Sequence, residues 1–419
     1  MMKKKQYIFK ASILFVIVLL FLLSVVGSSS VSSVRAQSNY SGTTTILIYD
    51  TSGSMDEKDV SGFTKMQAAI NAGVGILSVI EAENQANLSA LNEIGVVDFS
   101  RDAWVAAELT TNTGTIQSAL SSLTAGGGTA LPSGLSTALN LANNATSGTS
   151  TNIILLSDGV PNIGLNGEDD IALIQQQALD LASSAGSRGI CIYTIGFGVP
   201  GAIGAQSGEA SIDETFLQEI SARSGCGKYY NAQNAMDLGN VFVLSRHEFV
   251  GELRFQGQGE IAQDERVIIN TVDVPSSQES LLYTLQWPGS QLDPTLFDPA
   301  GKEVDTSYPG ATFTRGKTLA TIIVQNPIAG KWQLGVIGIN VPEGILKYNA
   351  ALSTRPLPVS AVIVDPVIPQ PVNPAYRPSD SGLGILPWMI FIIIGSALLI
   401  YATKVKKDKS SAYLQVVND

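Results

Sequence analysis

The segment Ile46–Met55, ILIYDTSGSM, places oxygen-bearing side chains at every second position directly after an apolar run. Asp50, Ser52 and Ser54 carry these oxygens, and Gly53 gives the backbone between them freedom to turn. Oxygens at this spacing converge on one side of a turn, where they could bind a hard cation such as Mg²⁺. Serine and aspartate after a strand also cap helices, so the segment alone leaves both interpretations open.

Two further segments carry side chains of the same kind. GGGTALPSG combines a glycine run with Thr129 just before a predicted helix, and LLSDGVPN places Asp158 directly after a buried strand. In a doubly wound sheet, ligands collect outside the carboxyl ends of the strands. The combined set is all oxygen, which suits Mg²⁺ foremost, with Mn²⁺ and Ca²⁺ as alternatives. The candidate metal ligands are Asp50, Ser52, Ser54, Thr129 and Asp158.

Apolar strands alternate with amphipathic helices between residues 43 and 243. This rhythm predicts an α/β fold with a doubly wound, mostly parallel sheet. The polar turn at residues 100–102 predicts a hairpin, and hence one antiparallel excursion at the edge of the sheet. The expected strands are 43–49, 94–99, 104–109, 152–156, 190–195 and 228–230, and the expected helices are 65–80, 116–123, 132–142, 171–185 and 213–223.

The pattern changes after about residue 250, where short apolar runs are separated by turn signals such as Pro288-Gly289. Such a pattern is typical of an all-β sandwich. Residues 354–382 contain seven prolines, a composition that cannot bury a core and that predicts an extended stalk. The expected strands of the sandwich are 266–272, 281–287, 295–297, 320–324, 332–339 and 346–352.

Both ends of the chain predict contact with a membrane. A lysine-rich start precedes an apolar run and the small-residue stretch that ends at Ala36, as in a cleavable signal peptide, although an uncleaved anchor is the alternative. The second apolar run is long enough to cross a bilayer, and the lysines after it place the tail in the cytoplasm. The expected order is a signal peptide or signal anchor at 1–36, an α/β domain at 43–246, a β-sandwich domain at 250–353, a stalk at 354–382, a C-terminal transmembrane helix at 383–402 and a cytoplasmic tail at 403–419.

Charge and cysteine content narrow the class of partner and the compartment. The net charge of −11 and the absence of a basic stripe disfavour nucleic acid as a partner. Cys191 and Cys226 both lie in the part expected outside the membrane, where a disulfide is the default. Two separate buried thiols are the alternative.

The segments DTSGSM, GGGTALPSG and LLSDGVPN resemble the three loops of the metal-ion-dependent adhesion site in von Willebrand factor A domains. The resemblance covers residues 43–243 and implies the strand order 3-2-1-4-5-6. It also implies that Ser52, Ser54 and Thr129 touch the metal, that Asp50 and Asp158 act largely through water, and that a partner's carboxylate completes the coordination. Because the last two strands are neighbours in this order, the resemblance favours a disulfide between Cys191 and Cys226. The extra acids Asp56, Glu57 and Asp59 are expected to form a solvated rim or to assist a second cation.

These features predict a membrane-anchored extracellular protein-binding module that captures an acidic protein ligand through a divalent cation. The alternative is a tethered regulatory subunit of a membrane channel, transporter or envelope complex. An enzyme is not expected: the chain has one histidine, His247, and lacks HExxH, GxSxG and P-loop motifs. GFGVPG at residues 196–201 matches a dinucleotide-binding pattern literally, but Pro200 and a long loop replace the helix start that such a site needs.

Overall fold

The structure of this protein is a computed structural model that describes residues 42–58, 62–86, 91–198, 212–289, 291–341 and 344–357. All of these ranges belong to one compact unit. The predicted signal peptide, transmembrane helix and cytoplasmic tail lie outside the described residues, as does the predicted stalk beyond residue 357. In the described ranges, no helix combines the length and the apolar composition that crossing a bilayer requires.

The first part of the chain forms a six-stranded sheet in the order β3-β2-β1-β4-β5-β6, as the resemblance implied. Every pair of neighbouring strands is parallel except β2 and β3, which form the predicted antiparallel edge. The strands are β1 (Gly42–Asp50), β2 (Leu91–Phe99), β3 (Ala103–Thr110), β4 (Ser150–Ser157), β5 (Cys191–Phe197) and β6 (Tyr229–Ala232).

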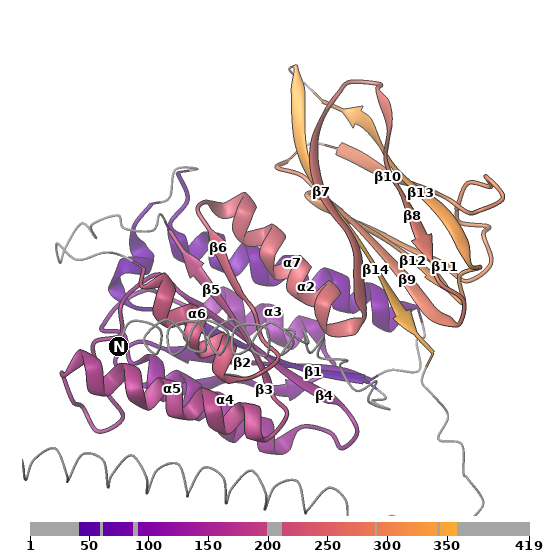
Figure 1. Ribbon diagram of the computed structural model, residues 1–419. Helices are drawn as coiled ribbons and strands as arrows, with labels where there is room; N and C mark the ends of the chain where they lie inside the picture. The colour runs from indigo at the N-terminus through magenta and orange to yellow at the C-terminus, as the bar shows by residue number, and fades with distance from the viewer. Residues whose placement is uncertain are drawn as a thin grey trace, which may run out of the picture. The chain divides into compact units, whose positions relative to one another are not determined.

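Helices cover both faces of this sheet (Figure 1). The central strand β1 is buried at every position, because Leu47 and Tyr49 face one layer of helices while Ile46 and Ile48 face the other. Helices α2, α3 and α7 pack against the first face, and α4, α5 and α6 against the second. The helices are α2 (Lys65–Gln85), α3 (Thr113–Ser122), α4 (Leu131–Leu141), α5 (Ile171–Ser187), α6 (Glu214–Arg223) and α7 (Ala235–Val250), with the short 3-10 helices η1 (Gly53–Asp56) and η2 (Ala142–Asn144).

The second part of the chain forms two antiparallel sheets around a core that includes the fully buried Trp332 and Tyr283. One sheet has the order β10-β13-β8 and the other β11-β12-β9-β14-β7. The sequence predicted six of these strands but missed β7 and β11, and β14 continues into the first residues of the predicted stalk. The strands are β7 (Glu252–Ala262), β8 (Arg266–Val274), β9 (Gln278–Gln286), β10 (Gln291–Phe297), β11 (Ala311–Arg315), β12 (Leu319–Gln325), β13 (Gly330–Asn340) and β14 (Ile345–Pro356).

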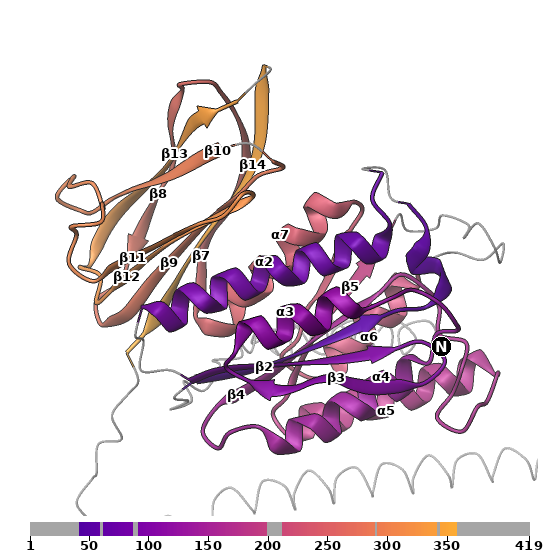
Figure 2. The same ribbon diagram turned by 180° about the vertical axis from the view of Figure 1, so that it is seen from behind.

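Helices α2 and α7 lie between the α/β sheet and the β-sandwich (Figure 2). Val79 and Ala82 of α2 and Val243 of α7 share a small buried cluster with Leu282 and Ile323 of the sandwich. Helix α7 was not predicted from the sequence. It joins the two parts of the chain and contributes side chains to both.

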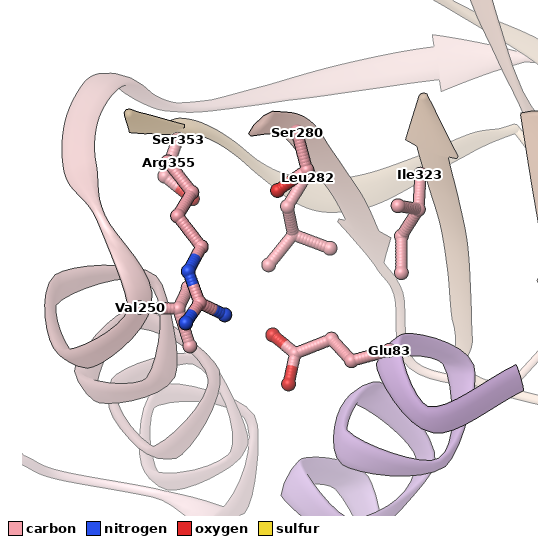
Figure 3. Close-up of a pocket in the computed structure, with 7 residues that line it drawn as sticks. All are labelled: Glu83, Val250, Ser280, Leu282, Ile323, Ser353 and Arg355. Carbon is pink, nitrogen blue, oxygen red and sulfur yellow. The ribbon is translucent and has the colours of Figure 1, made fainter. Parts of the chain in front are cut away.

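Polar side chains complete this interface. Arg246 on α7 is fully buried and donates from Nε to Glu83 Oε2 on α2 over 2.9 Å and from a terminal nitrogen to Thr43 Oγ1 over 2.7 Å. Figure 3 shows Glu83, Arg355 and side chains from α7, β9, β12 and β14 around a cavity of about 10 Å³, the size of about one water molecule. His247 is also buried, with Nδ1 2.8 Å from Ser353 Oγ and Nε2 2.8 Å from Thr284 Oγ1, so it is an interface residue.

Candidate metal centre

Two carboxylates lie at the carboxyl ends of the neighbouring strands β1 and β4. Asp50 is the last residue of β1, Asp158 follows the last residue of β4, and both side chains are fully buried. The Asp50 carboxylate accepts a hydrogen bond from the Ser52 N–H over 2.9 Å at Oδ1 and one from the Ser157 hydroxyl over 2.6 Å at Oδ2. These bonds fix the orientation of Asp50 at the edge of the sheet.

The serines of the first loop connect it to the third loop. Ser52 Oγ lies 3.1 Å from Ser54 Oγ, and the Ser54 hydroxyl donates to Asp158 Oδ1 over 2.8 Å. Alternate residues of the first loop therefore turn their oxygens to one side, as their spacing predicted.

Backbone hydrogen bonds hold the glycine-rich loop against the first loop. The Gly126 N–H donates to the Thr51 carbonyl over 2.8 Å, and the Gly53 N–H donates to the Gly127 carbonyl over 3.2 Å. Gly127 has φ of 91°, a left-handed conformation that favours glycine. This conformation leads the chain back across the site to Thr129.

Thr129 is held by a residue that the sequence analysis did not single out. Its N–H donates to Asn162 Oδ1 over 2.8 Å, and the Asn162 N–H donates to the Thr129 carbonyl over 3.0 Å. A Cβ atom built on Gly159 would lie 3.8 Å from Ser54 Oγ and 3.9 Å from Thr129 Oγ1, so both hydroxyls lie near Gly159. Asn162 ends the quoted segment LLSDGVPN, and a polar side chain that follows a proline turn there was the available signal.

The structure thus brings all five candidate ligands to one edge of the sheet, from three separate loops. Residues 45–160, which include all five, match the family model of the von Willebrand factor type A domain. These residues form a von Willebrand factor A domain.

Comparisons with individual proteins give matches at low sequence identity. The UPF0353 protein of Mycobacterium avium is 27% identical over 214 residues, a match that covers 48% of this chain and 59% of that protein's length. The crystal structure of a conserved hypothetical protein BatB from Bacteroides thetaiotaomicron aligns with 50% of this chain and 98% of its own, at 20% identity and a TM-score of 0.38. The pilus adhesin SpaC from Lactobacillus rhamnosus GG aligns with 76% of this chain and 45% of its own, at 16% identity and a TM-score of 0.43.

Von Willebrand factor A domains commonly bind a divalent cation, and the oxygen spacing at this site fits one. Ligands 2.0–2.1 Å from an octahedral Mg²⁺ lie roughly 2.9 Å apart along each edge of the octahedron. The contacts of 3.1 Å between Ser52 Oγ and Ser54 Oγ and of 2.8 Å between Ser54 Oγ and Asp158 Oδ1 are hydrogen bonds of about this length, so a small ion could replace them without moving the loops apart. Among the described residues, no group of three or more histidine, cysteine, aspartate or glutamate side chains could hold a metal ion, so hydroxyls would have to complete the set.

Lys65, the first residue of α2, places a cation beside this oxygen cluster. Its Nζ lies 2.7 Å from Asp158 Oδ2 and 3.1 Å from Glu57 Oε2, and the residue is only 7% exposed. The sequence analysis placed Glu57 in a solvated rim, whereas the structure pairs it with Lys65. A lysine at a helix N-terminus opposes the helix dipole, and that mismatch was the signal in the sequence.

Burial and mutual repulsion set the acidity of the two carboxylates. Burial, followed by the nearby Asp158, raises the pKa of Asp50 to about 7, although Ser157 and Ser52 oppose the shift. Burial also raises the pKa of Asp158, and the ion pair with Lys65 offsets part of that rise. Burial alone would lower the pKa of Lys65, but Asp158 and then Glu57 outweigh it and raise that pKa. The A domain therefore concentrates negative charge that a cation would relieve.

Away from this site, the structure contains the predicted disulfide between Cys191 and Cys226. Cys191 and Cys226 are bonded, with their Cα atoms 5.0 Å apart. The bond ties the start of β5 to the turn that precedes β6, as expected for two neighbouring strands of the A domain.

Proposed function

We propose that this protein is a membrane-anchored extracellular binding module, which captures a partner's carboxylate through a divalent cation at a metal-ion-dependent adhesion site. Ser52, Ser54 and Thr129 would hold the cation with their hydroxyl oxygens. Asp50 and Asp158 would supply negative charge, and Mg²⁺ is the favoured ion, with Mn²⁺ and Ca²⁺ as alternatives. The protein is not proposed to catalyse a reaction.

The convergence of the Ser52, Ser54 and Asp158 oxygens within hydrogen-bond distance of one another carries this proposal. Hydroxyl and carboxylate oxygens with no histidine or thiolate suit hard cations, Mg²⁺ foremost.

The chemistry of the donors explains why a partner would supply an acid. Neutral hydroxyls contribute no charge, and both Asp50 and Asp158 are already engaged by hydrogen bonds inside the protein. A dication held in this way keeps part of its positive charge. A carboxylate is the partner group that offers both an oxygen ligand and the missing negative charge.

The two ends of the chain support the proposed location. The apolar run before Ala36 and the run at 383–402 fit a secretory signal and a membrane anchor, and the lysines after the second run favour a cytoplasmic tail. The disulfide between Cys191 and Cys226 fits an oxidising compartment.

A matched pair of threonine variants tests the proposed site in the purified full chain. Thr129→Val removes a candidate ligand oxygen, whereas Thr45→Val removes a buried hydroxyl of β1 that makes no hydrogen bond in the described part of the protein. Titration calorimetry with Mg²⁺ should show at least about a tenfold loss of affinity for Thr129→Val and no loss for Thr45→Val. Equal affinity in the two variants would exclude Thr129 as a ligand.

Crosslinking in intact cells tests whether the cation serves partner capture. Adducts that form with wild type in Mg²⁺ should be absent with EDTA and with Thr129→Val. Adducts that form equally in both conditions would instead indicate a metal-independent scaffold.

A further inference from the structure

Lys65 occupies a position that its own helix does not favour. It is the first residue of α2, where the helix dipole disfavours a cation, and its side chain is buried although lysine usually lies exposed. The carboxylate of Asp158, 2.7 Å from the ammonium, offsets both the unfavourable helix dipole and the burial of the charge. The placement therefore serves the oxygen cluster rather than the helix.

The two oxygens of Asp158 face different partners. Oδ1 accepts from the Ser54 hydroxyl on the side of the candidate ligands, and Oδ2 accepts from the Lys65 ammonium on the other side. A divalent cation beside Ser54 would share this carboxylate with the ammonium. Two cations on one carboxylate repel each other, most strongly where water is excluded.

Glu57 offers the ammonium a second acceptor. Its Oε2 lies 3.1 Å from Lys65 Nζ, and its side chain is 26% exposed whereas that of Asp158 is fully buried. The Lys65 N–H also donates to the Glu57 carbonyl over 2.8 Å, so the two residues stay together. When a cation draws charge from Asp158, the ammonium can keep its bond to Glu57 without entering water.

We infer that Lys65 is a tethered counter-ion of Asp158 that competes with the divalent cation and thereby lowers the affinity of the site for metal. This inference rests on the proposed cation site. Its consequence is a bound cation that stays under-neutralised and free to attract a partner's carboxylate, while Asp158 keeps a charge partner when no metal is present.

Calorimetric titration of the full chain with Mn²⁺ tests this role through variants of opposite expected effect. Lys65→Met keeps the length of the side chain without its charge and should raise Mn²⁺ affinity by about tenfold or more. Lys65→Arg keeps the charge and should stay near the wild-type affinity. Glu57→Gln should lower the affinity, because the ammonium then stays on Asp158, and this loss should shrink in the double variant Lys65→Met/Glu57→Gln.

Thermal unfolding provides a second measurement, because Lys65→Met leaves Asp158 without its partner in the absence of metal. The melting temperature of Lys65→Met should fall below that of wild type in EDTA and should rise more than that of wild type when Mn²⁺ is added. If Lys65→Met does not fold in EDTA, Lys65→Gln retains a hydrogen-bond donor for the same comparison.

The outcomes separate the two proposals. Mn²⁺ affinity that is unchanged or weaker in Lys65→Met overturns the competition and leaves Lys65 as a residue that only orients Asp158, while the metal site stands. Mn²⁺ uptake by neither wild type nor Lys65→Met overturns the metal site itself, and with it the role of Lys65.

Discussion

Two buried ion pairs lie near the two ends of the 21-residue helix α2, roughly 27 Å apart at 1.5 Å per residue. At the C-terminal end, Glu83 pairs with Arg246, and both lie between the α/β sheet and the sandwich. At the N-terminal end, Lys65 pairs with Asp158 at the carboxyl edge of the sheet. The two buried ion pairs of α2 therefore differ in their surroundings.

The difference lies in what surrounds each pair. Arg246 is fully buried, and its guanidinium donates to Thr43 as well as to Glu83, so it is engaged by other residues of the protein. Asp158 also accepts from Ser54, and the hydroxyls of Ser54 and Thr129 both lie near Gly159, the next residue. The first pair joins the α/β sheet to the sandwich, whereas the second lies beside the candidate cation site.

Breaking the interface pair should give the largest change in stability. Arg246→Met leaves the Glu83 carboxylate buried without its partner, which should lower the free energy of unfolding by about 3–5 kcal/mol in urea titrations. Arg223→Met is the matched control, since Arg223 forms an exposed pair with Glu219 four residues before it, worth at most about 0.5 kcal/mol. If Arg246→Met lowers the free energy of unfolding as little as Arg223→Met does, the interface pair does not stabilise the protein.

The same interface should make the protein sensitive to acid through His247. Burial, followed by the nearby Arg246, lowers the pKa of His247 to about 3, below the usual value of 6.5. The contribution of the neutral His247 to stability is therefore complete above pH 6.5 and is lost as the pH falls towards 3. In that range the imidazole binds a proton in the unfolded chain but not in the folded protein. We expect a loss of about 2–3 kcal/mol between pH 6.5 and 4.5.

His247→Gln isolates this titration, because glutamine can still hydrogen-bond but carries no charge. Urea titrations of this variant should show a smaller fall in stability over the same pH range than wild type. A fall of equal size in both proteins would assign the acid sensitivity to other groups.

At the candidate metal site, removal of the Asp50 charge should stabilise the protein and weaken the proposed cation binding. Because the pKa of Asp50 is raised to about 7, the folded protein holds a proton between pH 4 and 7 that the unfolded chain has released. Stability from this group therefore falls as the pH rises through that window. Asp50→Asn avoids the cost, so its gain over wild type in EDTA should be larger at pH 8 than at pH 5, by about 1–2 kcal/mol.

Calorimetry with Mg²⁺ completes this comparison, since Asp50→Asn should bind the ion far more weakly than wild type. Asp50→Asn that loses stability at pH 8 would show that the carboxylate is kept for the fold. The interface and the metal site would then not differ in the way described above.

The loops of the candidate site could be predicted from the sequence, but Lys65 beside them could not. The candidate metal loops could be located because hydroxyls, carboxylates and glycines follow several apolar strands, and the parallel sheet brings such loops together. Lys65 was missed because its unfavourable position at the start of a helix does not indicate which carboxylate it contacts. Only its contact with Asp158, distant in sequence, gives it a role.

Helix α7 and strand β7 were missed for opposite reasons. Residues 241–247 of α7 are buried one after another, because the sheet covers one side and the sandwich the other, so the helix lacks the one-sided apolar pattern that predicts an amphipathic helix. Strand β7 is an edge strand paired only with β14, mostly half-exposed or exposed and rich in polar residues. Helix α7 therefore lacks the periodicity on which prediction depends, whereas in β7 the alternation of apolar and polar residues is weakened by Gly257 and Gly259.

The most direct test of the central claim is a crystal structure of the protein grown with MnCl₂ and measured for anomalous scattering. The account predicts one manganese peak at the carboxyl edge of the sheet, in contact with the hydroxyl oxygens of Ser52, Ser54 and Thr129. Well-ordered Ser52, Ser54 and Thr129 side chains with no manganese peak beside them would contradict the proposed cation site.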